Sequence, residues 1–199
     1  MRDAGGRGEE AMGARDEFVE RHVRAILDLP QDVKATCEVL DDEEIPPERR
    51  RLVAGALLGV LQPGDLLPDT WGPLGLLDDV VILRLAADAA APADSPERRR
   101  HAARFPEFWD ELPGDLAAAR TFFGDTFVLF ESRLTRLPLA EHKGKRAETA
   151  VLDETVRAWL YDELDQAMTD LELSEDDLYV AMRRIDALMA HLRRRLAHR

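Results

Sequence analysis

Four aspartates stand in an otherwise apolar stretch of the chain. They are Asp65, Asp69, Asp78 and Asp79, and residues 63–79 read PGDLLPDTWGPLGLLDD. A carboxylate among apolar residues is costly unless it is hydrogen-bonded or paired with a cation. Two or three such carboxylates could hold a divalent cation, and their hard oxygen ligands suit Mg²⁺ or Ca²⁺. The segment is therefore a candidate metal site.

The same aspartates have a structural explanation, which we favour. Asp65 and Asp69 lie in proline-containing turns, where an aspartate side chain accepts hydrogen bonds from backbone N–H groups. Asp78 and Asp79 fall in the first turns of a predicted helix, where the helix dipole favours anions, and Arg84 could pair with one of them. No nucleophile or base stands beside them, so a catalytic carboxylate pair is the weakest interpretation.

Elsewhere the sequence has no arrangement typical of catalysis or cofactor binding. It lacks the GxxxxGK[ST], GxGxxG, HExxH and GxSxG motifs. The five histidines are scattered, and we interpret His22 as a residue of the core or its boundary. The single cysteine, Cys37, excludes a disulfide framework and a Cys-rich zinc site, and we expect its thiol to be buried. We therefore predict no catalytic residue and no cofactor other than the alternative Mg²⁺ or Ca²⁺.

The charge of the chain narrows the class of partner. Its 199 residues carry 40 acidic and 27 basic side chains, a formal net charge of −13. A nucleic-acid-binding domain normally presents a basic face, so we expect no nucleic acid partner.

The N-terminus has no apolar signal-peptide region, and the longest apolar run, residues 52–61, is half the roughly 20 residues that a membrane helix needs. We expect a cytoplasmic protein.

Hydrophobic residues recur at helical spacing along the whole chain, which predicts an all-α fold. A first helix is expected to start near Asp16 and to stop at Pro30. Two further helices, residues 46–62 and 74–90, are apolar nearly all round, which is typical of buried helices. They should form a buried apolar helical hairpin with the aspartates in its turn.

The second half of the sequence predicts a helical layer over that hairpin. An aromatic cluster, residues 105–130, is expected in the core, with Asp115 as the N-cap of a helix that reaches residue 137. A charged loop should follow over residues 141–146. Two apolar seams, residues 152–171 and 178–196, have opposite surface charge and predict a C-terminal antiparallel αα-hairpin.

Composition divides the chain into three parts. Residues 1–14 are polar and glycine-rich, and we expect them to be disordered. Residues 15–95 form a helical region around the aspartate turn. Residues 96–199 form a second helical region that ends in the antiparallel hairpin and packs with the first as one compact multi-helix unit.

The apolar segment resembles a known family. Pro63, Asp65-Leu66-Leu67-Pro68-Asp69, Gly75 and Asp78-Asp79 resemble the pattern P-x-D-L-[IL]-P-D followed by G-x-[LI]-D-D of the YkvA-like family, a bacterial domain of unknown function. The resemblance covers about residues 54–86. Gly64 and Gly72-Pro73 depart from the residues usual in the family. Many relatives look like small membrane-associated proteins, whereas this chain is more polar, and the resemblance implies no known reaction.

Three functions remain open at this level. The absence of a catalytic constellation and the charged helical surfaces favour a non-enzymatic interaction or scaffold protein, which binds a protein partner or a second copy of itself. The first alternative is a divalent-metal-binding protein that uses the aspartate cluster. The second is a peripheral membrane-associated protein, which the net charge of −13 disfavours for anionic lipid.

Overall fold

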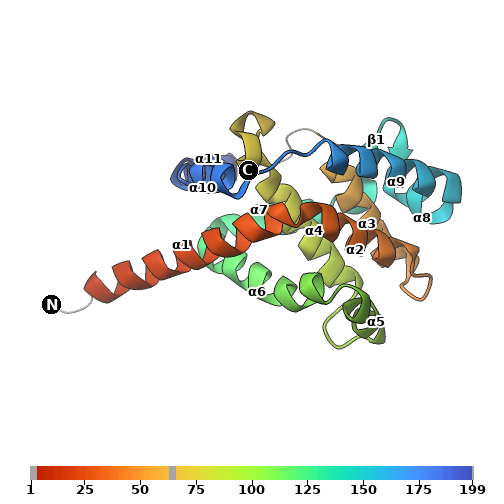
Figure 1. The fold of residues 1–199 in the computed structure, drawn as a ribbon, viewed down its shortest axis with the longest axis horizontal. Helices are drawn as coiled ribbons and strands as arrows, with labels where there is room; N and C mark the ends of the chain where they lie inside the picture. Colours follow the sequence, from red (N-terminus) through yellow and green to blue (C-terminus); the bar gives the residue numbers. More distant parts are fainter. Residues whose placement is uncertain (1–3, 63–65, 199) are drawn as a thin grey trace.

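A computed structural model describes residues 4–62 and 66–198, with side chains from residue 12 onward except that of residue 69. The fold is all-α, as the helical spacing predicted (Figure 1). Among the described residues, every helix is too short or too polar to span a bilayer. In chain order the helices are α1 (Ala4–Leu27), α2 (Leu29–Asp41), α3 (Pro47–Val60), η1 (Asp69–Leu76), α4 (Leu77–Ala90), α5 (Pro96–Arg104), α6 (Pro106–Phe123), η2 (Gly124–Phe127), α7 (Val128–Leu134), η3 (Leu137–Leu139), α8 (Ala147–Leu152), α9 (Glu154–Thr169), α10 (Glu175–Met182) and α11 (Ile185–Ala197).

The centre of the molecule is the predicted apolar hairpin, formed by α3 and α4. Both helices are buried along most of their length and pack against each other. On its other side α3 meets η3 so closely that a Cβ atom at Gly55 would lie 2.0 Å from the carbonyl oxygen of Leu137. Only a glycine fits there, so any side chain would force η3 away from the core.

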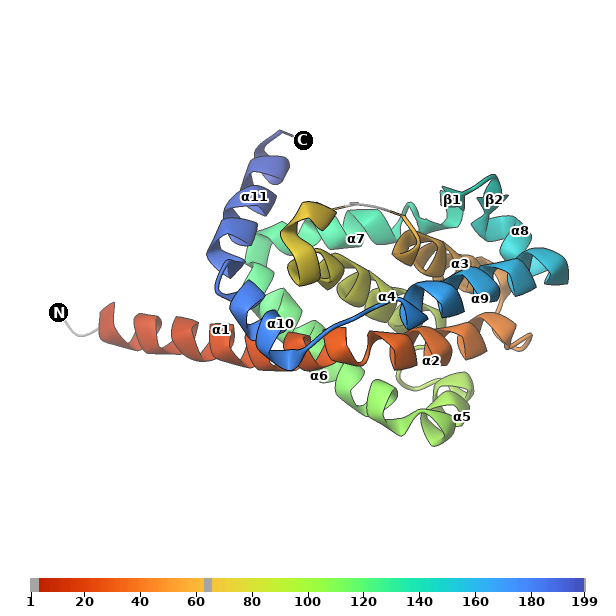
Figure 2. The same ribbon diagram turned by 45° about the horizontal axis from the view of Figure 1, so that its top comes forward.

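Helices α1, α2 and α6 cover α4 on one side (Figure 2). Aromatic rings of α1, α6 and α7 pack against one another in this part of the core. Phe18 of α1 stacks on Phe122 with ring centroids 4.2 Å apart and meets Phe123 edge-on. Phe130 of α7 continues the stack beside Phe123. The rings of Phe123 and Phe130 are fully buried, so the prediction that the aromatic cluster belongs to the core is confirmed.

The helix expected between Asp115 and residue 137 takes a different form. Helix α6 already begins at Pro106, because proline suits the first turn of a helix, and it passes through Asp115 without a break. The helix ends at Gly124, whose φ of +50° suits glycine, and η2 and α7 continue in a new direction. Asp115 is therefore a buried mid-helix residue instead of an N-cap.

The first helix also starts earlier than the composition suggested. The structure places α1 from Ala4, ahead of the expected N-cap at Asp16, and so over most of the segment predicted to be disordered. Its early turns extend beyond the rest of the molecule (Figure 1). Ala, Glu, Arg and Met are good helix formers, and each residue added to an existing helix costs far less than starting one.

Residues 141–146 form a small β-hairpin where the sequence predicted a loop. Strands β1 (Glu141–His142) and β2 (Lys145–Arg146) pair antiparallel, with Glu141 opposite Arg146. The two residues between them, Lys143 and Gly144, both have positive φ angles. Two such residues in succession make a turn whose twist matches that of the flanking strands.

The predicted C-terminal antiparallel hairpin is wrong. Helix α9 packs on α2, α3 and α8, whereas α10 packs on α1 and η1, and α11 meets η2. An extended stretch, residues 170–174, carries the chain from one side of the molecule to the other (Figure 2). Both apolar seams are buried, but each packs against the rest of the protein and not against the other seam. A regular apolar seam predicts that a helix packs against an apolar surface, but it does not identify that surface.

The basic helix α5 is held by acids of the first half of the chain. Arg98 is buried, lies over the Trp109 ring at 4.6 Å and pairs with Asp88 at 2.9 Å. Arg100 pairs with Asp42 at 2.9 Å, and Arg104 pairs with a glutamate of α2. These arginines neutralise acidic residues of the same chain.

Candidate functional site

In the aspartate turn, Asp78 connects the residues before η1 with the start of α4. It lies in the first turn of α4 and is buried. Its Oδ2 atom accepts hydrogen bonds from the backbone N–H groups of Leu66 at 2.8 Å and Leu67 at 3.1 Å. The carboxylate thereby accepts hydrogen bonds from two backbone N–H groups that have no partner within a helix. It holds Leu66 and Leu67 against the start of α4.

The other three aspartates are distributed around this point. Asp79 is half-buried in the same helical turn, Asp69 begins η1, and Asp65 lies outside the described residues together with the side chain of Asp69. Across the described residues, no three His, Cys, Asp or Glu side chains are placed to hold a metal ion. The described part of the turn thus shows a backbone-binding role for Asp78.

Helix α11 closes the turn from outside. The carbonyl oxygen of Leu66 accepts a hydrogen bond from Arg195 at 2.9 Å and lies 3.2 Å from Nε2 of His191. The His191 ring also meets Trp71 of η1 edge-on, at 5.5 Å between centroids. Leu66 is therefore held by Asp78 through its N–H group and by α11 through its carbonyl oxygen.

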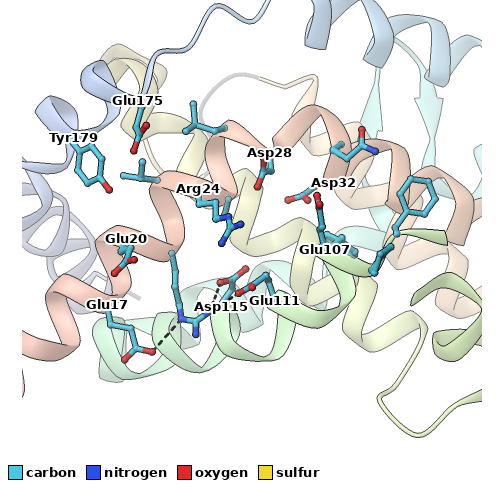
Figure 3. Close-up of a pocket in the computed structure, with 18 of the residues that line it drawn as sticks. Glu17, Glu20, Arg24, Asp28, Asp32, Glu107, Glu111, Asp115, Glu175 and Tyr179 are labelled. Atoms are coloured by element: carbon cyan, nitrogen blue, oxygen red, sulfur yellow. Dashed lines mark hydrogen bonds and ion pairs between the residues drawn. The ribbon is translucent and has the colours of Figure 1, made fainter. Parts of the chain in front are cut away.

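A larger feature lies between α1, α2 and α6. It is a cleft of about 910 Å³, to which α10 adds one rim (Figure 3). Carboxylates outnumber arginines eight to three in its lining, although Phe105, Phe108 and Leu27 also contribute apolar surface. The acids are Glu17, Glu20, Asp28, Asp32, Glu107, Glu111, Asp115 and Glu175, and the arginines are Arg21, Arg24 and Arg104. A concave surface of this size and charge is suited to binding a cation.

At the base of the cleft, one buried arginine joins two buried carboxylates. Nη1 of Arg84, from α4, lies 2.6 Å from Oδ2 of Asp32, and its Nε donates to Oδ2 of Asp115 at 3.1 Å. All three side chains are less than 5% exposed. Arg21 also reaches Asp115, so Asp32 is the carboxylate that has Arg84 as its single cationic partner among the described residues.

Asp32 has one oxygen that the protein leaves available. Its Oδ2 faces Arg84, whereas Oδ1 takes part in no hydrogen bond or ion pair among the described residues. Figure 3 shows the Asp32 carboxylate directed toward the space between α2 and α6, with Asp28 and Arg24 nearby. Oδ1 is not fully buried, so it is open to a ligand that enters the cleft.

Burial shifts the proton affinity of this group. Burial raises the pKa of Asp32 to about 7, against the opposing effect of Arg84 and with a further increase from Asp28. Burial also raises the pKa of Asp115, which Arg84 and Arg21 counteract. A perturbed carboxyl in a cleft is a recognised marker of functional sites.

Arg21 forms the wall of the cleft between α1 and α6. Its guanidinium binds Glu111 at 3.0 Å, Glu17 at 3.3 Å and Asp115 at 3.4 Å. It lies against Gly114 of α6, where a Cβ atom would be 2.8 Å from Nη1 of Arg21. The missing side chain at Gly114 thus lets the arginine lie flat on α6 and reach Asp115.

His22, one residue further, is buried in the core as predicted. It stacks on Phe18 with 4.0 Å between centroids, and its Nδ1 lies 2.9 Å from the carbonyl oxygen of Phe18. That oxygen can only accept, so Nδ1 carries the proton. Burial lowers the pKa of His22 to about 3, and the positive charges of Arg84 and Arg21 act in the same direction.

Sequence analysis missed the cleft and misplaced Arg84. The arginine was expected to pair with Asp78 or Asp79, but it binds Asp32 and Asp115, which are far away in sequence. A signal was present: Asp32 and Asp115 each stand on an apolar helix face, and Arg84 is the one charge amid the apolar residues 80–87. Three isolated charges on three apolar faces predict a buried cluster.

The comparisons with known proteins concern the central hairpin. Residues 49–85 match a family described as protein of unknown function (DUF1232). The match confirms the YkvA-like resemblance and covers α3, η1 and most of α4. Searches of curated proteins and of solved structures found no match. Within the DUF1232 segment lie Asp78 and Arg84, whereas Asp32 and Asp115 lie outside it.

Proposed function

We propose that this protein is a cytoplasmic, non-enzymatic interaction protein that binds a basic segment of a partner protein in the cleft between α1 and α6. The observation that carries the proposal is the excess of carboxylates in the lining of a cleft of about 910 Å³, with Asp32 and Asp115 buried at its base. Electrostatic complementarity with lysine and arginine side chains would steer the partner and set its register.

The shape of the cleft favours a peptide segment over a small cation. Its acidic lining runs from Glu17 on α1 to Asp28, the residue that follows α1, roughly 16 Å along a helix axis at 1.5 Å per residue. That length matches several residues of an extended chain. Apolar lining from Phe105 and Phe108 offers a surface for the aliphatic stems of lysine or arginine.

Binding of a labelled octalysine peptide tests the proposal, with fluorescence anisotropy as the readout. We expect micromolar affinity at low salt and a Kd that rises with ionic strength, because exposed charges are screened. Replacing Glu20 and Glu175 with lysine should weaken binding at least tenfold, since both exposed acids line the cleft.

A matched control separates the cleft from the overall negative charge. Asp162→Lys with Asp165→Lys changes the net charge by the same amount on α9, which does not line the cleft. Equal losses in the two double variants would assign binding to net charge and contradict the proposal. Displacement of the peptide by an equal concentration of spermidine would assign the cleft to small polyamines and contradict it as well.

A further inference from the structure

The base of the cleft differs chemically from its rim. The rim acids Glu17, Glu20 and Glu175 are exposed, so water competes for each of them. Asp32 is 2% exposed, and only its Oδ2 has a protein partner, the guanidinium of Arg84. A cation that reaches Oδ1 would therefore meet a carboxylate that is already desolvated and held in one orientation.

The charges around Asp32 leave room for one more cation. Arg84, from α4, faces both Asp32 and Asp115, and Arg21, from α1, also binds Asp115. Asp28, at the junction of α1 and α2, adds a further carboxylate. The packed elements also carry Arg24 of α1 and Glu107 of α6, which line the same cleft. Glu111 of α6 pairs with Arg21, and His22 of α1 stays neutral.

We propose that Oδ1 of Asp32 is the subsite for a single lysine ammonium group of the bound segment, an inference that rests on the proposed function. A guanidinium prefers two acceptor oxygens in a bidentate pair, and Arg84 already occupies the second oxygen of Asp32. An ammonium is a compact charge that a single oxygen can satisfy, and the neighbouring Asp28 can accept a second of its hydrogen bonds.

Binding at this subsite is coupled to a proton. Because the pKa of Asp32 is about 7, part of the population carries a proton on this carboxyl at neutral pH. An incoming ammonium favours the ionised form, so that proton leaves to the buffer while the ammonium keeps its own.

Calorimetry of octalysine binding at pH 7, in phosphate and in Tris buffer, measures the proton release directly. We expect a fraction of a proton released per peptide, and none with Asp32→Asn. We also expect octalysine to bind the wild type about tenfold more tightly than octaarginine, an advantage that Asp32→Asn removes. The control variant Asp162→Asn, on α9 outside the cleft, should keep both the preference and the proton release.

The possible results distinguish a failure of the lysine subsite from a failure of the proposed function. Salt-sensitive binding of both peptides with equal affinity and no proton release would overturn the lysine subsite and leave the acidic cleft intact. No binding of either peptide would overturn the proposed function, and the subsite with it. If Asp32→Asn does not fold, the wild-type proton release and the preference for lysine still decide the question.

Discussion

The aspartate turn and the acidic cleft use carboxylates in opposite ways. In the turn, both hydrogen bonds to Asp78 come from backbone N–H groups about 12 residues away, and the oxygen that accepts them is fully occupied. In the cleft, Asp32 and Asp115 share an arginine from a third helix, and one oxygen of Asp32 is left available. A carboxylate bound to backbone stabilises the fold, whereas one that is incompletely paired with charge can receive a ligand.

Among substitutions in the two regions, we expect the largest loss of stability at Arg84. Replacing it with methionine leaves Asp32 and Asp115 buried without their shared cation, and we expect a loss of about 3–5 kcal/mol in the free energy of unfolding. Urea denaturation measures the loss. Arg193→Met, at an exposed position on α11, should cost less than about 0.5 kcal/mol. Similar stability of the two variants would show that the buried cluster contributes little.

The turn should respond less strongly. Asp78→Asn keeps the shape of the side chain but removes its charge, and we expect a loss of about 1–2 kcal/mol, the usual effect of losing a charge-assisted bond to backbone. Thermal unfolding measures it. Asp176→Asn, an exposed aspartate in the first turn of α10, controls for the helix dipole. A loss as large as that of Arg84→Met would remove the distinction between the two regions.

The pH dependence of stability should be small, because two buried groups oppose each other. Asp32 has a raised pKa, so it stabilises the fold below about pH 4 and loses that contribution as pH rises to about 7. His22 has a lowered pKa, so its contribution is present above about pH 6.5 and is lost as pH falls toward 3. Between pH 4 and 6.5 the two slopes cancel.

Single substitutions should separate the pH dependence of stability due to Asp32 from that due to His22. In Asp32→Asn, stability to urea should rise with pH from 4 to 6.5, because the contribution of His22 is then no longer opposed by Asp32. In His22→Phe, stability should fall over the same range. Parallel pH profiles in the two variants would contradict the assignment of these pKa shifts to burial.

The smallest effect is expected from removing metal. We expect EDTA to leave the melting temperature unchanged, because Asp78 is occupied by two backbone donors. A melting temperature that falls with EDTA and is restored by Mg²⁺ or Ca²⁺ would show that Asp65, Asp69, Asp78 and Asp79 bind a cation, because a ligand of the folded state raises its stability.

Local patterns explain which parts of the structure were predictable. The helical spacing, the apolar hairpin of α3 and α4 and the aromatic core all follow from residues a few positions apart. The course of the C-terminal helices did not follow, because the apolar faces of α9 and α11 could pack on each other or on the body. The five residues 170–174 are long enough, at about 17 Å when extended, to allow either arrangement.

The sequence by itself determined the helices, the burial of α3 and α4 and the match of residues 49–85 to a family pattern, because these depend on short-range periodicity and a contiguous motif. Only the tertiary structure decided that Asp32, Arg84 and Asp115 meet. Each charge stands alone on its own helix, and its partner is set by which helices pack together. The physical cost of burying an unpaired charge says that a partner must exist, but packing alone identifies it.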